Sequence, residues 1–238
     1  TAMLRRLPYP RARDWQDESL VPGRVDLCLQ LFRRLHPAYE RFYQVENDVV
    51  FRGDWRTLFA ELDASPADLL ATNIFRQDEN PGWYHWPGLQ VGDLPPERRL
   101  RAFCPFCRLS RRALLATDAY YRRGWRGHFE GLIPTILLAE GLAIEDIGGE
   151  GPFVPPGRER RYYWSDRLKS EGLAPGSFVF RPLQTPTGAE PWLWHPVKIA
   201  QRRDLWHRLR CLWRGHLRLD RLLREDERYR RLEELLAL

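Results

Sequence analysis

The sequence predicts a mixed α/β domain followed by an amphipathic helical tail. Its 238 residues are 43% hydrophobic and 13% aromatic, a composition that supports a sizeable core and excludes a disordered chain. Apolar residues at helical spacing alternate along the chain with short β-branched and aromatic stretches that are typical of buried strands. From residue 201 to residue 238 only the helical spacing remains.

The N-terminal part of the chain is expected to form an arm, a helix, a strand and a second helix. Residues 1–24 are rich in proline and arginine and lack periodicity, whereas residues 25–35 carry apolar side chains at helical spacing. The β-branched and aromatic stretch over residues 42–51 predicts a buried strand with a turn. Asp54 is suited to cap the next helix, over residues 55–62.

The middle of the chain is expected to alternate strands and helices around a long loop. Short strands are predicted over residues 67–72 and 104–108, and residues 76–98 form a loop that is unusually rich in aromatic residues. The helices of this region are expected over residues 110–123, with Ser110 as the cap, and over residues 132–139, with Pro134 in the first turn and Gly141 at the end.

The last part of the domain is expected to be a strand, a glycine-rich loop and two late strands. These elements are predicted over residues 142–147, 148–157, 177–182 and 192–199, with a turn at residues 185–188. The domain as a whole is therefore expected to cover residues 25–200, and the helical tail residues 201–238.

The charge balance does not by itself indicate a protein that binds nucleic acid. The chain carries 38 basic and 32 acidic residues, but only Lys169 and Lys198 are lysines, and such an excess of arginine is as typical of genome composition as of a selected surface.

Acidic residues interleave with the arginines of the tail, so we expect the tail to pack on the domain or to form a homodimer. No apolar run is long enough for a transmembrane segment. A cytoplasmic location is favoured, or the secretory pathway if a membrane anchor has been truncated.

Two carboxylates in the pattern Glu46-Asn47-Asp48 lie in the first strand stretch, before a glycine turn. Carboxylates at a strand end can hold Mg²⁺ or Mn²⁺, and water or phosphate oxygens fill the remaining positions of the ion. Residues two apart share a strand face, so Glu46 and Asp48 are expected on the same side. The alternative interpretation is an ordinary pair of surface acids.

The tract Gly124-Trp125-Arg126-Gly127-His128-Phe129-Glu130 combines glycines, an aromatic ring and two proton acceptors. The glycines permit a close approach of the backbone to a ligand, Trp125 offers a flat platform for a sugar, and Glu130 or His128 could act as a general base. We expect the base to be Glu130, since it lies at the start of an apolar helix. The alternative is a turn leading into a helix whose positive end Glu130 favours.

The segment His195-Pro196-Val197-Lys198 lies on a late predicted strand. A neutral imidazole can complete a metal site, and an ammonium group can bind a diphosphate as a point charge. His195 is therefore a third candidate metal ligand, and Lys198 is a candidate diphosphate ligand.

The segment Cys104-Pro105-Phe106-Cys107 precedes a predicted helix and has the spacing of thiol redox sites. A cysteine pair at a helix start has a lowered thiol pKa and resembles the glutaredoxin active site. A glutaredoxin domain has this motif near its N-terminus after one strand, whereas about a hundred residues precede it here. We therefore expect buried, structural thiols, and a thiol oxidoreductase remains an alternative.

Taken in chain order, these motifs resemble the functional elements of GT-A glycosyltransferases, the nucleotide-diphospho-sugar transferase fold. The resemblance covers residues 25–200 and is carried by Tyr43-Gln44-Val45-Glu46-Asn47-Asp48-Val49, Arg108-Leu109-Ser110, the tract 124–130 and residues 195–198. It implies a mixed sheet flanked by helices. It also implies that Glu46 and Asp48 take the place of the acidic Asp-x-Asp-type motif, which binds the metal and the donor diphosphate at a strand end.

The same resemblance implies a function, a cofactor and partners. Glu130 would deprotonate an acceptor hydroxyl, His195 would be the late metal-binding histidine, and Lys198 would bind the diphosphate of a UDP- or GDP-sugar. The cofactor would be Mn²⁺ or Mg²⁺, and the acceptor a carbohydrate or glycoconjugate. The residues expected to stack on a sugar are Trp83, Tyr84, Trp86 and Trp125.

Two features depart from the family pattern. The metal motif is Glu-Asn-Asp instead of Asp-x-Asp, and only 45 residues precede Glu46, where the family has about a hundred. The nucleotide-binding part is therefore expected to be short or missing. A non-catalytic relative that binds carbohydrate or protein is a second alternative function.

Overall fold

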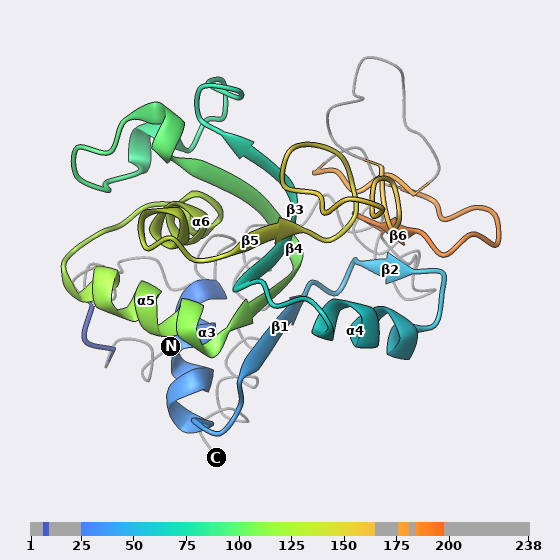
Figure 1. Cartoon of the computed structure of the whole chain (residues 1–238), viewed down its shortest axis with the longest axis horizontal. Helices are drawn as coiled ribbons and strands as arrows, with labels where there is room; N and C mark the ends of the chain where they lie inside the picture. The colour runs from blue at the N-terminus through green and yellow to red at the C-terminus, as the bar shows by residue number, and fades with distance from the viewer. Residues whose placement is uncertain (1–6, 10–24, 165–175, 181–183, 198–238) are drawn as a thin grey trace, which may run out of the picture. The chain divides into compact units, whose positions relative to one another are not determined.

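A computed structural model describes residues 7–9, 25–164, 176–180 and 184–197, which form a mixed α/β domain (Figure 1). Its helices are α3 (Val25–Leu35), α4 (Trp55–Asp63), α5 (Arg111–Arg122) and α6 (Phe129–Ala139), with the short 3-10 helices η1 (Trp86–Gly88) and η2 (Pro96–Arg98). Its strands are β1 (Arg41–Val45), β2 (Val50–Phe51), β3 (Leu69–Arg76), β4 (Leu100–Ser110), β5 (Ile144–Asp146) and β6 (Leu193–Trp194).

Four strands form the central sheet in the order β1-β4-β3-β5. Strand β4 runs antiparallel to both β1 and β3, whereas β5 runs parallel to β3 and forms one edge. A second sheet pairs β2 with β6 antiparallel. This second pairing brings the chain after β6 next to the turn that follows β1.

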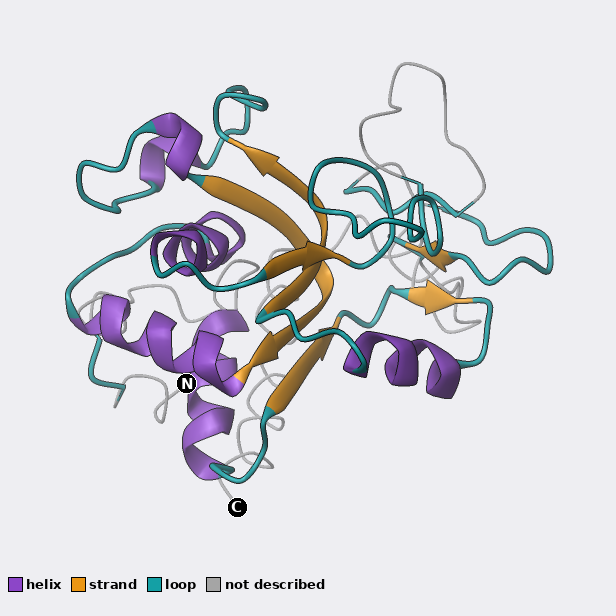
Figure 2. Ribbon diagram, in the orientation of Figure 1, coloured by secondary structure: helices purple, strands orange, loops and turns teal. Residues whose placement is uncertain are grey.

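Helices cover both faces of the central sheet, as Figure 2 shows. One core cluster joins the sheet to α3, α5 and α6, and a second joins it to α4, β2 and β6. Strand β4 contributes to both clusters, with Ala102, Cys104, Cys107 and Leu109 in the first and Phe103 and Phe106 in the second. Successive side chains of β4 therefore stop alternating regularly between the two faces at Pro105. Proline has no backbone N–H to donate to a neighbouring strand.

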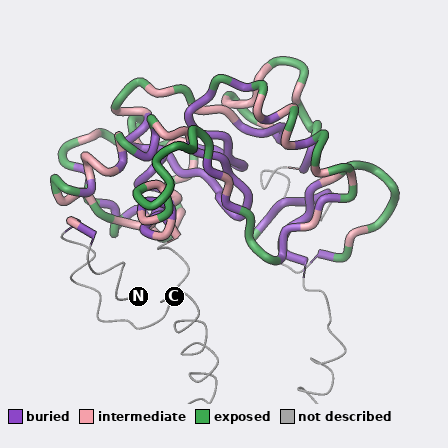
Figure 3. Tube along the Cα trace, turned by 90° about the horizontal axis from the view of Figure 1, so that it is seen from below, coloured by how far each residue is buried: buried purple, intermediate pink, exposed green. Residues whose placement is uncertain are grey.

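Strand β4 is the most enclosed element of the sheet. It is paired on both sides, and ten of its eleven residues are buried. The buried segments of the chain follow the sheet, while the exposed segments are outer loops (Figure 3). Side chains and backbone groups attached to β4 thus rest on a well-packed support.

Within the described residues, the structure confirms the four helices expected in the domain and refines one of them. The Asp54 carboxylate accepts a hydrogen bond from the Arg56 N–H (2.9 Å) at the start of α4, and Ser110 caps α5 in the same way. Helix α6 begins at Phe129, three residues earlier than expected. Pro134 therefore lies beyond the first turn, and Glu130 lies within it.

Two strand predictions need correction near the candidate carboxylates. The stretch over residues 42–51 is not one strand, because a turn separates β1 from β2. The strand expected over residues 104–108 is longer and runs from Leu100 to Ser110. Its length was hidden in the sequence because Arg101 and Pro105 interrupt the pattern of a buried strand.

The late strands also differ from the prediction. Among the described residues of this region, β6 covers only Leu193 and Trp194, and Phe178 forms an isolated parallel bridge with His195. The segment 177–180 is therefore held by single contacts and not by a ladder. Residues 181–183 and 198–199 lie outside the described residues.

The predictions for the two ends of the chain concern segments that the structure does not describe. Residues 1–6, 10–24 and 198–238 include most of the expected arm and all of the expected helical tail, so the tail and its homodimer stay predictions. None of the helices in the described part of the chain is both long and apolar enough to cross a membrane.

Candidate active site

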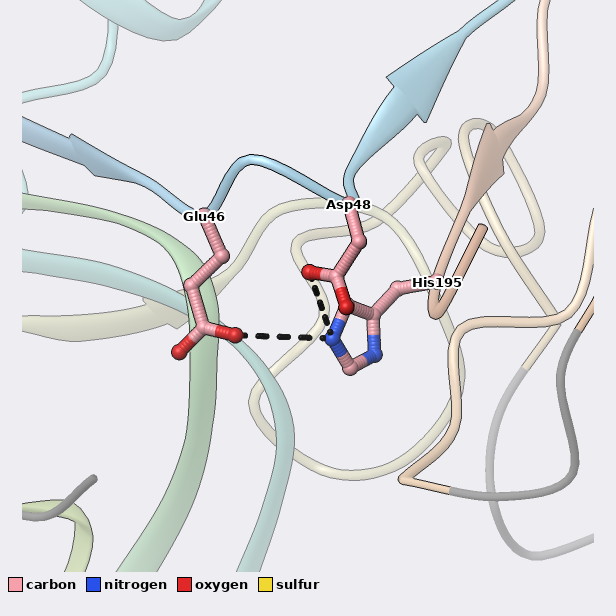
Figure 4. A group of neighbouring side chains, drawn as sticks. All are labelled: Glu46, Asp48 and His195. Atoms are coloured by element: carbon pink, nitrogen blue, oxygen red, sulfur yellow. Dashed lines mark ion pairs between the residues drawn. The ribbon is translucent and has the colours of Figure 1, made fainter. Parts of the chain in front are cut away.

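Glu46 and Asp48 lie in the turn that connects β1 to β2. The Glu46 N–H donates to the Pro105 carbonyl of β4 (2.7 Å), and the Val49 N–H donates to the Glu46 carbonyl (3.2 Å). The two acids were expected to share a strand face, and that expectation is wrong because a turn holds them. The turn nevertheless directs both carboxylates towards one imidazole (Figure 4).

His195 follows β6 and reaches this turn because β6 pairs with β2. The Val197 N–H donates to the Asp48 carbonyl (2.8 Å), which ties the two segments together. Nδ1 of His195 lies 2.7 Å from the Val179 carbonyl oxygen. A carbonyl oxygen only accepts hydrogen bonds, so Nδ1 carries the proton and Nε2 of the neutral ring has a lone pair to offer.

The three side chains form a compact group of possible ligands. Nε2 of His195 lies 3.6 Å from Oε2 of Glu46 and 3.5 Å from Oδ1 of Asp48 (Figure 4). One ligand atom from each residue lies within 4.8 Å of the others. The Glu46 side chain is 43% exposed and the His195 side chain 5%, so the group is open to solvent on the Glu46 side.

This donor set could hold a divalent cation. The two carboxylates suit Mg²⁺ and Mn²⁺, and the imidazole is also a ligand for Zn²⁺ and Fe²⁺. Neighbouring ligands of an octahedral ion are roughly 3 Å apart when each lies about 2.1 Å from it, and the separations of 3.6 and 3.5 Å from Nε2 of His195 are longer than that value. Three protein ligands leave room for water or for a phosphate group.

Glu130 forms a second acidic site in the first turn of α6. The Cys104 N–H donates to its Oε1 (2.8 Å), and its side chain is 14% exposed. Burial raises the pKa of Glu130 to about 7, against the Cys104 hydrogen bond and the charge of Arg101, which both lower it. The charge of Glu46 raises this pKa, and a positive charge on His195 would lower it, so the two sites interact. A carboxyl with this pKa can take up or release a proton near neutral pH.

His128 caps the helix that carries Glu130. Its Nδ1 accepts a hydrogen bond from the Glu130 N–H (3.4 Å) and lies 3.7 Å from Oε2 of the same residue. The ring stacks on His85 with centroids 3.8 Å apart. Because Nδ1 is an acceptor in this arrangement, the neutral ring carries its proton on Nε2. His128 therefore has a clear role in positioning the start of α6.

Trp83 lies against the start of α6. A Cβ atom added to Gly131 would lie 2.9 Å from the Trp83 ring, so the glycine is required for this close approach. The guanidinium of Arg101 lies over the same ring at 5.8 Å. The structure thus places one of the predicted stacking residues beside the residue that follows Glu130.

The other predicted stacking residues have different surroundings. Tyr84 is 74% exposed, whereas Trp86 is 4% exposed and donates its indole N–H to the Asn80 carbonyl (2.8 Å). Trp125 packs edge-on against Tyr120 with ring centroids 4.4 Å apart. A shallow pocket of about 540 Å³ is lined by Gln77, Pro81, Gly82, Trp83, Tyr84, Trp86, Pro87, Leu89 and Arg99.

Two successive residues of β4 join the two acidic sites. The N–H of Cys104 binds Glu130, and the carbonyl of Pro105 accepts the N–H of Glu46. Gln44 in β1 donates its side-chain amide to the Cys104 carbonyl (3.0 Å). The separation between the sites is therefore set by the backbone of the best-buried strand.

The cysteine motif lies inside β4 and not at a helix start. Cys104 and Cys107 are free thiols that are buried in the core cluster shared with α3, α5 and α6. Hydrogen bonding with Cys107 and burial raise the pKa of Cys104 well above its ordinary value. A raised pKa disfavours the reactive thiolate, so this environment favours a structural role over redox chemistry.

Three buried polar residues behind His195 were not singled out from the sequence: Asn73, Asp146 and Tyr163. The one signal for them was the asparagine inside the apolar stretch that becomes β3.

Lys198, the expected diphosphate ligand, lies outside the described residues and stays a prediction. No protein-family model, curated protein or solved structure matches the chain.

Proposed function

We propose that this chain is a GT-A glycosyltransferase, which moves a sugar from a UDP- or GDP-sugar to an acceptor hydroxyl. The observation that carries the proposal is the convergence of Glu46, Asp48 and His195 from two distant segments, with Nε2 of the histidine facing both carboxylates. The order of the motifs along the chain, which resembles that of GT-A enzymes, supplies the reaction class.

Glu46, Asp48 and His195 hold a divalent cation, Mn²⁺ or Mg²⁺, next to the donor diphosphate. When bound, the cation neutralises the charge that develops on the departing nucleotide. Asp48 and His195 are the fixed ligands, because their side chains are only 11% and 5% exposed. The more exposed Glu46 closes the site on the solvent side, and Lys198 adds a positive charge for the phosphate oxygens.

Glu130 takes the proton of the acceptor hydroxyl. Its Oε1 already accepts the Cys104 N–H, so Oε2 is the oxygen offered to the substrate. The acceptor oxygen bonds to the anomeric carbon, the bond from that carbon to the diphosphate breaks, and the hydroxyl proton passes to Oε2. A pKa near 7 suits this role, because a base is most effective when its pKa is close to the working pH.

The acceptor is a carbohydrate or a glycoconjugate in this proposal. Trp83, which lies against Gly131, and the exposed Tyr84 line a shallow pocket, and flat rings are suited to the apolar faces of sugars. Gln77 and Arg99 supply polar groups on the same wall. The pocket is open to solvent, as a site for a chain of sugars requires.

Calorimetry with Mn²⁺ and with UDP or GDP tests the metal site. We expect Mn²⁺ and the nucleotide to bind more tightly together than separately, because phosphate oxygens complete the coordination. Asp48→Ala and His195→Ala remove metal ligands. They should weaken Mn²⁺ binding by more than the roughly 10- to 100-fold that follows the loss of a residue that only hydrogen-bonds to a metal ligand. Glu190→Ala is the matched control, since it removes an exposed carboxylate from the segment that carries His195.

The same titrations distinguish the alternative functions. If Mn²⁺ affinity is equal in the wild type and in both ligand variants, the metal-dependent mechanism is ruled out. Cation-dependent nucleotide binding without sugar transfer or hydrolysis would identify a non-catalytic relative. Rapid thiol labelling at pH 6, with no response to Mn²⁺, would point back to a thiol oxidoreductase.

A further inference from the structure

We propose that Asn73 and Tyr163 are positioning residues for the metal centre. By fixing the Phe178 carbonyl, they hold in place the neighbouring Val179, whose carbonyl binds Nδ1 of His195, so that Nε2 of the ring faces Glu46 and Asp48. This inference rests on the proposed function, because it takes Nε2 of His195 as a cation ligand.

His195 is held by hydrogen bonds to the segment 177–179. Its Nδ1–H donates to the Val179 carbonyl (2.7 Å), and its own carbonyl accepts the Val179 N–H (3.1 Å). The rings of Phe103 and Phe178 pack on the imidazole with centroids 5.2 and 5.3 Å away. The direction of Nε2 is therefore fixed only if the segment 177–179 stays in place.

Asn73, in β3, supports that segment. The segment forms isolated bridges and no strand, and its backbone bonds only to Trp164 and His195 in these bridges, so a side chain of the central sheet adds a separate support. The amide of Asn73 donates to the Phe178 carbonyl (2.8 Å). Asn73 has a φ of 48°, in the left-handed region that asparagine tolerates better than most residues, and the β3–β4 register shifts beside it. This departure from regular strand geometry lets a residue of the central sheet reach Phe178.

Asn73 is itself held by a buried hydrogen-bond network that includes Tyr163 and Asp146. Its N–H donates to the hydroxyl of Tyr163 (2.7 Å), which donates to Oδ2 of Asp146 (2.5 Å). Oδ1 of Asp146 accepts the N–H groups of Gly148 and Gly149 at 2.9 and 2.8 Å. Asn73, Tyr163 and Asp146 are each no more than 1% exposed. A buried network in which each member has a partner has one favoured arrangement, and this one ends at the Phe178 carbonyl, one residue before the carbonyl that binds the His195 ring.

The test combines two variants with one matched control. Asn73→Gly removes the amide and keeps a residue that accepts the positive φ, and Tyr163→Phe removes one hydroxyl and keeps the ring. Tyr162→Phe is the control, because the hydroxyl of Tyr162 bonds to Glu61 at the side of α4 and not to this network. All three are made in the full chain, and circular dichroism and melting temperature establish that each is folded.

Two measurements are made on each protein. Calorimetry gives the affinity for Mn²⁺, and nitrogen NMR of isotope-labelled imidazoles, without metal, gives the fraction of His195 with its proton on Nδ1. We expect Asn73→Gly to weaken Mn²⁺ binding by about 10- to 100-fold, as for other outer partners of metal ligands, and to lower the fraction protonated on Nδ1. Tyr163→Phe should act in the same direction with a smaller effect, and Tyr162→Phe should change neither quantity.

The outcomes separate this inference from the proposed function. If the wild type binds Mn²⁺ through His195 but Asn73→Gly and Tyr163→Phe leave affinity and tautomer unchanged, the positioning role is overturned and the metal site stands. If Asn73→Gly does not fold, the result for Tyr163→Phe decides. A wild type that binds no Mn²⁺ would overturn the proposed function and the positioning role together.

Discussion

The two acidic sites beside β4 are built in opposite ways. Glu46 and Asp48 lie on a turn that is open to solvent on one side, and both face a histidine whose tautomer is fixed by a backbone carbonyl. Glu130 is enclosed between α6 and β4, accepts the Cys104 N–H, and has a pKa that burial raises to about 7. The first site offers oxygen ligands to a cation, and the second offers a carboxyl that can be neutral or charged.

This contrast shows that surroundings, and not residue type, assign the roles. Glu46 and Glu130 are the same amino acid and interact through their charges, yet only Glu130 has lost most of its contact with water. Separating two carboxyl environments in this way is how one site supports both charge stabilisation and proton transfer. Each prediction below tests one side of that separation.

The largest expected effect is on catalysis. Glu130→Gln keeps the size of the side chain but removes the proton acceptor, so sugar transfer should fall by about 10²- to 10⁴-fold. Mn²⁺ affinity should change far less than sugar transfer, because Glu130 is not among the three ligands and acts on Glu46 only through its charge. Product formation and calorimetry measure the two quantities, with Glu140→Gln at the exposed end of α6 as the control. Transfer at the wild-type rate would make Glu130 structural and His128 the next candidate base.

The second prediction concerns stability as a function of pH. The pKa of Glu130 is about 7 in the folded chain and near 4.5 when the side chain is exposed. Between these values the folded state binds a proton that the unfolded state has released, so the stabilisation present below pH 4.5 is lost as pH rises through 7. By linkage, this loss amounts to up to about 3 kcal/mol.

Urea unfolding of the wild type and of Glu130→Gln in EDTA measures this loss. The variant should gain stability relative to the wild type between pH 5 and pH 8, because it has no proton to release. Glu140→Gln should follow the wild-type curve. Parallel curves for the wild type and Glu130→Gln would mean that Glu130 titrates like an exposed acid and that the two sites do not differ in this respect.

The local parts of the fold could be predicted from the sequence, and the parts that depend on distant contacts could not. Asp54 and Ser110 cap helices within three residues of themselves, so the starts of α4 and α5 are visible in the sequence. The extent of β4 depends on pairing with β1 and β3 on both sides, and Arg101 and Pro105 conceal it. A pattern within a few residues cannot show which distant strands will cover them.

The candidate site was predictable to a similar degree. The spacing of Glu46 and Asp48 indicated a pair of ligands, although a turn and not a strand face brings them together. The hydrogen bond from His195 to the Val179 carbonyl joins residues across a loop, and no sequence pattern announces it. Asn73 gave only the signal of a polar residue among apolar neighbours, since its partners Tyr163 and Phe178 come from two other segments.

The third prediction separates the structural role of His128 from a chemical one. His128→Ala removes the cap of α6 and should lower stability by about 1 kcal/mol, whereas Asn accepts the same backbone N–H and should restore it. If His128 only positions α6, His128→Asn should also restore sugar transfer. Urea unfolding and product formation check both statements, and an Asn variant that is stable but inactive would place His128 in the proton-transfer step.

The smallest expected effect is that of the thiol between the two sites. Cys104 contacts Glu130 through its backbone N–H, and Pro105 contacts Glu46 through its carbonyl, so neither bond needs the sulfur atom. Cys104→Ala should therefore leave Mn²⁺ affinity and sugar transfer unchanged, with a modest loss of stability because a buried atom is removed.

Thiol labelling measures the reactivity of Cys104 in the native chain. Because the pKa of Cys104 is raised and both thiols of the motif are buried, the native chain should label there only as fast as it opens. Cys28, which is partly exposed, and Cys211, which lies outside the described residues, should be replaced by serine in this measurement so that their reaction does not mask that of the motif. Rapid labelling of Cys104, or loss of transfer in Cys104→Ala, would show that the sulfur and not the backbone of β4 links the two sites.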